Sequence, residues 1–206
     1  MLLKINRDNP NPRLVKKAAQ CLRDGGIIVY PTDTIYGLGC DIHNSKAVER
    51  ICRIKGIDPK KSNLSFVCES LSHLSDYTRP FDRWVYRLMH KSLPGPYTFI
   101  LKVSSEVPKL LKSKKKTVGI RVPDNNIARA IVAELGRPIL STSLKALDED
   151  DPLEYITDPE LIYEEYHKLV DIVVDGGSGG NQPSTVLDCT GDDLVVLRLG
   201  LGEVEE

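Results

Sequence analysis

Polar side chains that could bind a ligand stand directly after stretches that the sequence predicts to be strands. The triplet Thr-Asp-Thr at 32–34 follows the apolar run 27–30, and a Ser-Thr-Ser triplet at 141–143 follows the short run 138–140. Arg121 stands near the end of a third run. Hydroxyls in turns often bond only the local backbone, but ligand sites in open α/β sheets gather beyond the ends of strands. The shared position of these groups therefore predicts one ligand site.

The cysteines and histidines show neither metal-binding nor catalytic spacing. The 206 residues include five cysteines and four histidines, with no C-x-x-C pair and no H-E-x-x-H motif. An odd number of scattered cysteines also argues against a disulfide framework. We therefore expect the cysteines to be small buried hydrophobes, and we predict no metal ion held by the protein.

Charge is distributed unevenly along a chain whose formal net charge is only −1. Nine acidic residues and no basic ones fall between 147 and 165. The basic residues concentrate earlier, in three groups: Lys55, Lys60 and Lys61; Arg79, Arg83, Arg87 and Lys91; and Lys109, Lys112, Lys114, Lys115 and Lys116. This asymmetry predicts a face that attracts anions, although a solvated helix face and a flexible loop carry similar charge runs.

Helix and strand signals alternate along the chain. Asn11 and Pro12 are suited to begin a helix that the glycine pair 25–26 ends, and Asp124 or Asn125 is suited to begin another. Helices are expected over about 12–24, 45–54, 82–91 and 125–135, and strands over 27–30, 64–67, 97–103, 117–122, 138–140, 170–174, 184–189 and 194–198.

This order predicts an α/β protein with one twisted, open sheet of mixed parallel and antiparallel strands and flanking helices. Helices between the early strands favour parallel pairing, and short links favour an antiparallel meander of the last three strands, with a hairpin turn at 176–180. The length suits a single domain over 1–206. Because the sequence contains neither an apolar run of about 20 residues nor a leader pattern, we expect a cytoplasmic protein.

One long motif and six shorter ones are spread along the chain. The long one is G-G-I-I-V-Y-P-T-D-T-I-Y-G-L-G-C-D at 25–41. The others are I-x-x-I-K-G at 51–56, P-G-P-Y-T-F-I-L at 94–101, V-G-I-R-V-P at 118–123, P-I-L-S-T-S at 138–143, Q-P-S-T-V-L-D at 182–188 and V-L-R-L-G at 196–200. Together they resemble the YrdC/Sua5/YciO family, most of all its YciO branch, over nearly the whole chain. The resemblance implies a YrdC-like fold.

Active members of that family make threonylcarbamoyl-adenylate from L-threonine, bicarbonate and ATP, release pyrophosphate, and so begin the t6A modification of tRNA. The resemblance implies a nucleotidyltransferase of this kind, with ATP as a substrate that Mg²⁺ could accompany. The residues that match nucleotide contacts are Lys55, Lys61, Ser141, Ser143 and Arg198. Those that match threonine contacts are Thr34, Arg121 and Ser184. Turn hydroxyls and a structural ion pair are the alternatives for these side chains.

Three positions depart from the family pattern. Ile57 stands where the K-x-R signature has arginine, and Ser143 stands where the S-x-N signature has asparagine. Val67 or Cys68 stands where a histidine is usual. A neighbouring lysine lacks the planar fork of an arginine, and a serine cannot replace both polar groups of an amide. The departures therefore predict weak or altered synthase activity.

A second function stays open, namely non-catalytic binding of double-stranded RNA or tRNA through the basic cleft. Members of the family have long been regarded as RNA binders, and basic side chains bind the phosphate backbone of RNA whatever its sequence. The residues expected to do so are Lys109, Lys112, Lys114, Lys115, Lys116, Arg83 and Arg87.

Overall fold

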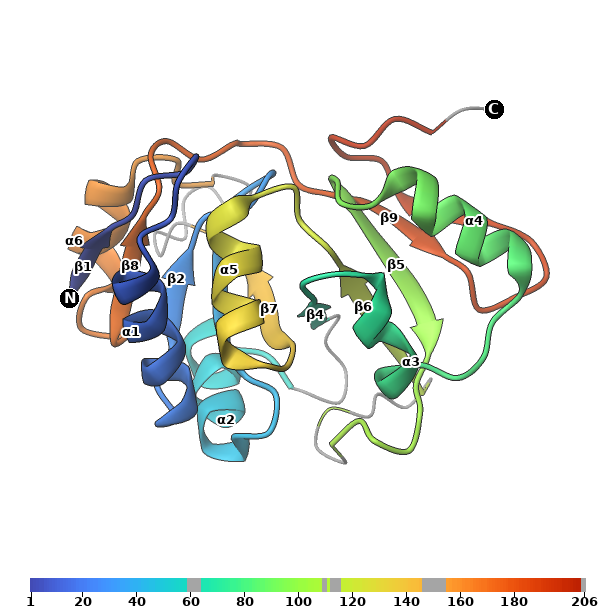
Figure 1. Cartoon of the computed structure of the whole chain (residues 1–206), viewed down its shortest axis with the longest axis horizontal. Coiled ribbons are helices and arrows are strands. Elements are labelled where there is room, and N and C mark those ends of the chain that lie inside the picture. The colour runs from blue at the N-terminus through green and yellow to red at the C-terminus, as the bar shows by residue number, and fades with distance from the viewer. Residues whose placement is uncertain (59–63, 109–110, 112–115, 146–154, 205–206) are drawn as a thin grey trace.

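Ten strands form one mixed sheet that runs through the molecule (Figure 1). The computed structural model describes residues 1–58, 64–108, 111, 116–145 and 155–204. Parallel and antiparallel pairs both occur, as predicted. In sheet order the strands are β1 (Leu2–Lys4), β8 (Ile172–Asp175), β2 (Ile28–Tyr30), β3 (Gly37–Asp41), β7 (Ile139–Ser143), β4 (Ser65–Val67), β6 (Thr117–Arg121), β5 (Tyr97–Lys102), β9 (Thr185–Asp188) and β10 (Val195–Arg198).

Six α-helices flank this sheet in the described part of the chain, and local signals mark their ends. The Asn11 side chain accepts from the Arg13 N–H, and the Asn125 side chain accepts from the Ala128 N–H at 3.0 Å. Both are N-cap bonds of the kind expected. The helices are α1 (Pro12–Arg23), α2 (Ser45–Lys55), α3 (Leu74–Tyr77, after the 3-10 turn Leu71–His73), α4 (Arg83–Ser92), α5 (Asn126–Leu135) and α6 (Pro159–Tyr166).

Alternate side chains of the central strands pack against helices on opposite sides of the sheet. Ile28 and Tyr30 of β2 join a core with α1 and α5, which lie side by side in Figure 1. Val29 joins a second core with α2 and α6, on the other side of the sheet. α4 belongs to this second core through Val85 and Met89. The α/β prediction is thus confirmed.

The expected parallel pairing of the early strands is found for β4 and β6 but is wrong between β2 and β7, because a strand intervenes that the sequence did not reveal. Residues 37–41, G-L-G-C-D, form β3, which pairs antiparallel with both β2 and β7. Glycine is depleted in strands, but a Cβ at Gly37 would lie 3.2 Å from the Tyr30 ring. The close approach of that ring explains why glycine stands in this strand.

The expected meander of the last three strands is wrong for β8. This strand lies between β1 and β2 and runs parallel to both, so six strands separate it from β9. The glycine-rich segment 176–180 is therefore part of a connection across the sheet instead of a hairpin turn. The Gly180 N–H donates to the Thr34 carbonyl at 2.8 Å, and a Cβ there would lie 2.2 Å from that oxygen. Only β9 and β10 form the expected antiparallel pair.

Candidate functional site

A cleft of about 480 Å³ opens on one face of the sheet over β7, β4, β6, β5 and β9. Register places Ser65 beside both Gly119 and Ser141, so these three residues share the cleft face. Phe66 and Ile120 point the other way into the core. The floor is made of small residues, and a Cβ at Gly119 would lie 2.8 Å from the Ser65 Oγ. The sheet itself therefore provides room for a ligand.

Arg121, the last residue of β6, forms one wall of the cleft and contacts the loop between β2 and β3. Its Nη2 donates to Asp33 Oδ1 and to Thr34 Oγ1, each at 2.9 Å. Asp33 Oδ2 accepts from the Asp124 N–H at 3.1 Å. The side chains of Arg121 and Asp33 are only 11% and 8% exposed. The buried Arg121 Nε has no partner among the described residues, which leaves it available to a ligand.

Arg198 of β10 also lines the cleft. Its Nε and Nη2 donate to the Ser184 carbonyl at 3.2 and 2.7 Å, and Ser184 Oγ lies 2.8 Å from Thr98 Oγ1. Burial lowers the pKa of Arg198; Tyr155 opposes that shift and the positive charge of Arg121 adds to it. Two guanidinium groups therefore act on each other in the same cleft. Such a pair favours an anionic ligand.

Ser141 and Ser143 lie two positions apart on β7 and line the same cleft. The buried Tyr30 hydroxyl lies 2.7 Å from Ser141 Oγ and donates to it. Burial raises the pKa of Tyr30 to about 12, although the bond to Ser141 opposes this shift. The Tyr30 ring lies over Gly37 and Gly39 of β3 and so holds Ser141 from the side. The triplet 141–143 lies within β7, which pairs with β3 as far as Ser143, and not beyond the strand as expected.

Lys55 ends α2 and is not among the residues that line the cleft. Burial lowers its pKa, and the positive charge of Lys145 adds to the shift. Gly56 caps the helix in the left-handed conformation, and the half-buried Ile57 packs against the core. The position where the family has arginine thus carries an apolar contact in this chain.

The cleft unites most of the residues that the motifs predicted for nucleotide and threonine. Five line it directly, and Thr34 joins them through its bond to Arg121. Those five are Arg121, Ser141, Ser143, Ser184 and Arg198. The other predicted residues, apart from Lys55 and those of α4 and Lys116, lie outside the described part of the chain: Lys61, Lys109, Lys112, Lys114 and Lys115.

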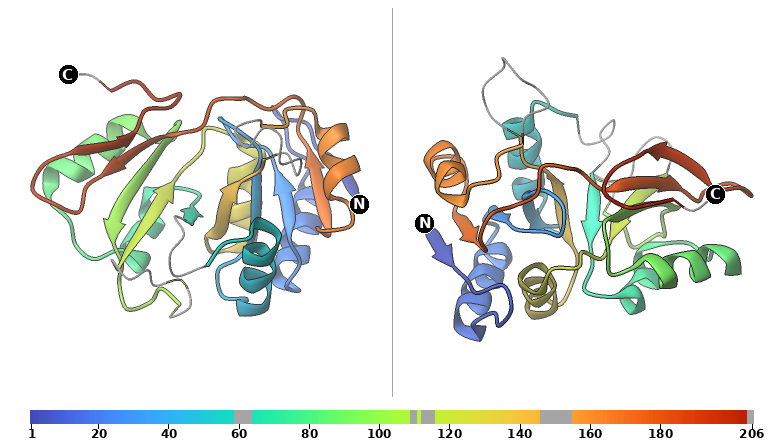
Figure 2. Two further views of the ribbon diagram at one scale, coloured as in Figure 1. Left: turned by 180° about the vertical axis from the view of Figure 1, so that it is seen from behind. Right: turned by 90° about the horizontal axis from the view of Figure 1, so that it is seen from above.

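The arginines predicted to bind RNA lie away from the cleft. Arg83 and Arg87 are exposed on α4, which packs on the face of β5 opposite to the cleft (Figure 2). Lys116 is exposed and precedes β6. The cleft and the α4 arginines therefore form two separate surfaces.

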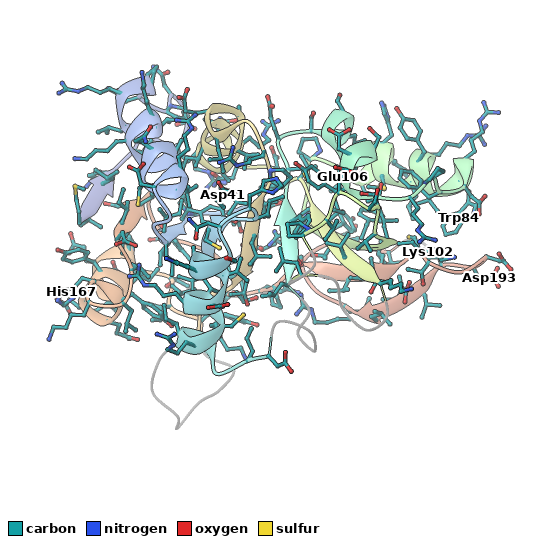
Figure 3. All side chains as sticks on the ribbon, turned by 90° about the horizontal axis from the view of Figure 1, so that it is seen from below. Asp41, Trp84, Lys102, Glu106, His167 and Asp193 are labelled. Carbon is teal, nitrogen blue, oxygen red and sulfur yellow. The ribbon has the colours of Figure 1, made fainter. Side chains whose placement is uncertain are left out.

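Three residues of the site were not predicted as contacts, although Tyr30 and Thr98 lie within the motifs at 25–41 and 94–101. Thr98 supports Ser184, Tyr30 supports Ser141, and Lys102 lines the cleft beyond Thr98. Alternation along β5 could have placed Thr98 and Lys102 on one face. Figure 3 shows Lys102 at the end of the molecule that carries Asp193, far from His167.

Two general features of the described residues bear on the chemistry. Within them, no three histidine, cysteine, aspartate or glutamate side chains gather as metal ligands would. None of the helices found there has the length and apolar character to cross a membrane.

Known proteins resemble this chain over most of its length. The family profile Sua5_yciO_yrdC, described as telomere recombination, matches residues 20–200. The uncharacterized protein YciO of Escherichia coli K12 is 48% identical over 202 residues, which cover 98% of this chain and 96% of that protein. Threonylcarbamoyl-AMP synthase of Bacillus subtilis is 33% identical over 192 residues, which cover 92% of this chain and 54% of the synthase.

Solved structures show the same fold. The crystal structure of E. coli YciO superimposes with a TM-score of 0.92 at 45% identity, covering 100% of this chain and 98% of that one. P. abyssi Sua5, crystallised with L-threonine, gives a TM-score of 0.87 at 27% identity, covering 97% of this chain and 57% of that one. The YrdC-like fold predicted from the motifs is confirmed.

Proposed function

Because the chain belongs to the Sua5/YciO/YrdC family, we propose that its cleft makes threonylcarbamoyl-adenylate from L-threonine, bicarbonate and ATP. In this reaction the threonine amine and bicarbonate form a carbamate with loss of water. A carbamate oxygen then attacks the α-phosphorus of ATP, and pyrophosphate leaves. The product would serve the t6A modification of tRNA in the cytoplasm, with residues 1–206 acting as one domain.

The observation that carries this proposal is the convergence of Arg121 and Arg198 on one cleft. Asp33 accepts from the Nη2 of Arg121, and the unpaired Nε of Arg121 can donate to the carboxylate of an amino acid. Thr34 and Ser184 stand beside the two arginines as hydroxyl partners. The arrangement supports an amino acid at the Arg121 wall and a phosphate at the Arg198 wall.

The chemistry asks the protein mainly to bring two anionic reactants together. Arg198 is suited to stabilise negative charge that develops as pyrophosphate leaves. The small floor residues Gly119 and Ser65 leave space for the carbamate between the walls. The changes at Ile57 and Ser143 lie on the nucleotide side. We therefore expect a lower rate or a looser choice of nucleotide, and an intact amino-acid site.

Pyrophosphate release tests this function. ATP, bicarbonate and each amino acid in turn are supplied to the wild-type protein, to Arg121→Ala and to the control Arg83→Ala, which removes an exposed cation on α4. We expect release that depends on threonine, and a large loss in Arg121→Ala alone. If no amino acid stimulates release in the wild-type protein, the synthase proposal is wrong.

RNA binding is the second candidate function, and the exposed pair Arg83 and Arg87 favours it. The two residues stand one helical turn apart on α4, so both can contact the phosphates of one strand. Gel shifts of a duplex RNA at low and moderate salt test the idea. Binding should weaken steeply with salt and in Arg83→Ala/Arg87→Ala. A shift that is insensitive to both would exclude this surface.

A further inference from the structure

We infer that Lys145 forms, together with Lys55, a two-lysine site for the phosphates of ATP at the rim of the cleft. The pair would take the place of the arginine that the family has at the position of Ile57. The inference rests on the proposed function and adds a nucleotide-binding residue that none of the sequence motifs contains.

α2 runs back along β3. β3 has five residues and pairs antiparallel with β7, so that Gly37 lies opposite Ser143. α2 follows β3, packs against it and has 11 residues. A helix of this length rises about 16 Å, and such a strand spans roughly 14 Å. The last turn of α2, with Lys55, therefore comes back to the level of Gly37 and Ser143.

Lys145 lies two residues beyond Ser143, the last residue of β7. The Leu144 N–H donates to the Tyr36 carbonyl at 3.0 Å, and the Tyr166 hydroxyl donates to the Lys145 carbonyl. These two hydrogen bonds fix the backbone just beyond the end of β7. Tyr36 and Ser143 line the cleft, so Lys145 leaves the sheet at the rim of the same cleft.

The positive charge of Lys145 acts on Lys55. Burial is the main reason that the pKa of Lys55 is lowered, and the positive charge of Lys145 is the second. The positive charge of Lys145 therefore makes the charged state of Lys55 less favourable. A phosphate group bound between two such cations relieves this repulsion. Two like charges brought together at the rim of a cleft are thus suited to a multiply charged anion.

Ile57 stands two residues after Lys55, at the position where the family has arginine. Its side chain packs against the core beside α2, so the K-x-R segment offers only Lys55 to a ligand. A second cation has to come from another element. Lys145 comes from the end of β7, the strand that also carries Ser141 and Ser143.

The proximity of the two lysines is tested without any ligand. The pKa of Lys55 is measured by NMR titration of its side chain in the wild-type protein, in Lys145→Ala and in Lys168→Ala, which removes an exposed lysine after α6. We expect the Lys55 pKa to rise in Lys145→Ala only. An unchanged value would show that the two ammonium groups do not interact, and would overturn the inference.

Calorimetry with ATP, pyrophosphate and L-threonine tests the binding role. Lys145→Ala should weaken ATP and pyrophosphate binding about 10-fold, as expected for a lost charge-assisted bond, and leave threonine binding unchanged. Lys145→Arg should retain the affinity, and Lys168→Ala should match the wild type. If wild type binds ATP and Lys145→Ala binds it equally well, the inference fails while the proposed function stands. If wild type binds neither ATP nor pyrophosphate, both fail.

Discussion

The two ends of the cleft differ in how completely their contacts are built. At the Arg121 end, Arg121 donates to both Asp33 and Thr34 at 2.9 Å, and Asp33 also accepts from the backbone N–H of Asp124. At the end proposed to bind phosphate, Lys55 does not line the cleft and is followed by the apolar Ile57, and a serine stands at position 143 in place of the amide of the family motif.

This difference shows which part of the ligand the fold specifies. At the Arg121 end, hydrogen bonds hold Asp33, Thr34 and the Arg121 Nη2 in place, and such preorganisation strengthens binding of a carboxylate. The phosphate end depends on separate long side chains, which lose more conformational freedom when they bind. We therefore expect selectivity for the amino acid to be sharper than affinity for the nucleotide.

The largest effect should come from breaking the Arg121 end. Arg121→Ala leaves the nearly buried Asp33 carboxylate without its cation, and such a loss costs about 3–5 kcal/mol of unfolding free energy. Urea unfolding measures it. Asp33→Asn in the same background should recover part of the loss, because it removes the unpaired charge. A loss below about 1 kcal/mol would show that this pair contributes little.

The next largest effect should come from rebuilding the phosphate end. Ile57→Arg with Ser143→Asn restores the two family side chains, and one charge-assisted bond is worth about 1.5–3 kcal/mol. Threonine-dependent pyrophosphate release should therefore rise roughly 10- to 100-fold. Because Ile57 packs against the core, Ser143→Asn alone serves as the matched control. A normally folded double variant with unchanged release would place the divergence elsewhere in the cleft.

A smaller effect should come from loosening the support of Arg198. Thr98→Val removes the hydroxyl that lies 2.8 Å from Ser184 Oγ, which costs about 1–2 kcal/mol where both groups are buried. The KM for ATP should rise several-fold because Arg198 is bonded to Ser184, and the KM for threonine should rise as well because Ser184 is a predicted threonine contact. Thr98→Ser keeps the hydroxyl and should behave as wild type. Unchanged KM values in Thr98→Val would show that this hydroxyl does not support the cleft.

The smallest effect should come from Tyr30→Phe. This change removes the hydrogen bond to Ser141 and nothing else, so unfolding free energy should fall by about 1 kcal/mol. Ser141→Ala should lower it by a similar amount, and the double variant should show little further loss. Fully additive losses would mean that the two hydroxyls do not stabilise each other.

Local signals made the helices predictable, and long-range pairing made the sheet topology hard to predict. Asn11, Asn125 and Gly136 act at helix ends through contacts within a few residues. β3 was missed because its glycines are required by the ring of Tyr30, a contact that no local pattern reveals. β8 was misplaced because short glycine-rich links occur both in hairpins and in connections across a sheet.

The site was predictable only where motifs carried it. Arg121, Ser184 and Arg198 were predicted from motifs, and the cleft brings them together. Asp33 stood in the first triplet, but nothing in the sequence paired it with Arg121. In the sequence Thr98 looks like an ordinary strand residue. Its role depends on β9 lying next to β5.

The position of β8 between β1 and β2 has a consequence for synthesis of the chain. β1 and β2 are complete by Tyr30, but their common neighbour ends at Asp175. At about 5–20 residues per second, a ribosome needs on the order of 10 s to make the intervening chain. During that time the apolar strand Ile28–Tyr30 has no partner on this side. The protein is therefore expected to complete its sheet late, and to need protection of this strand by chaperones while it is being made.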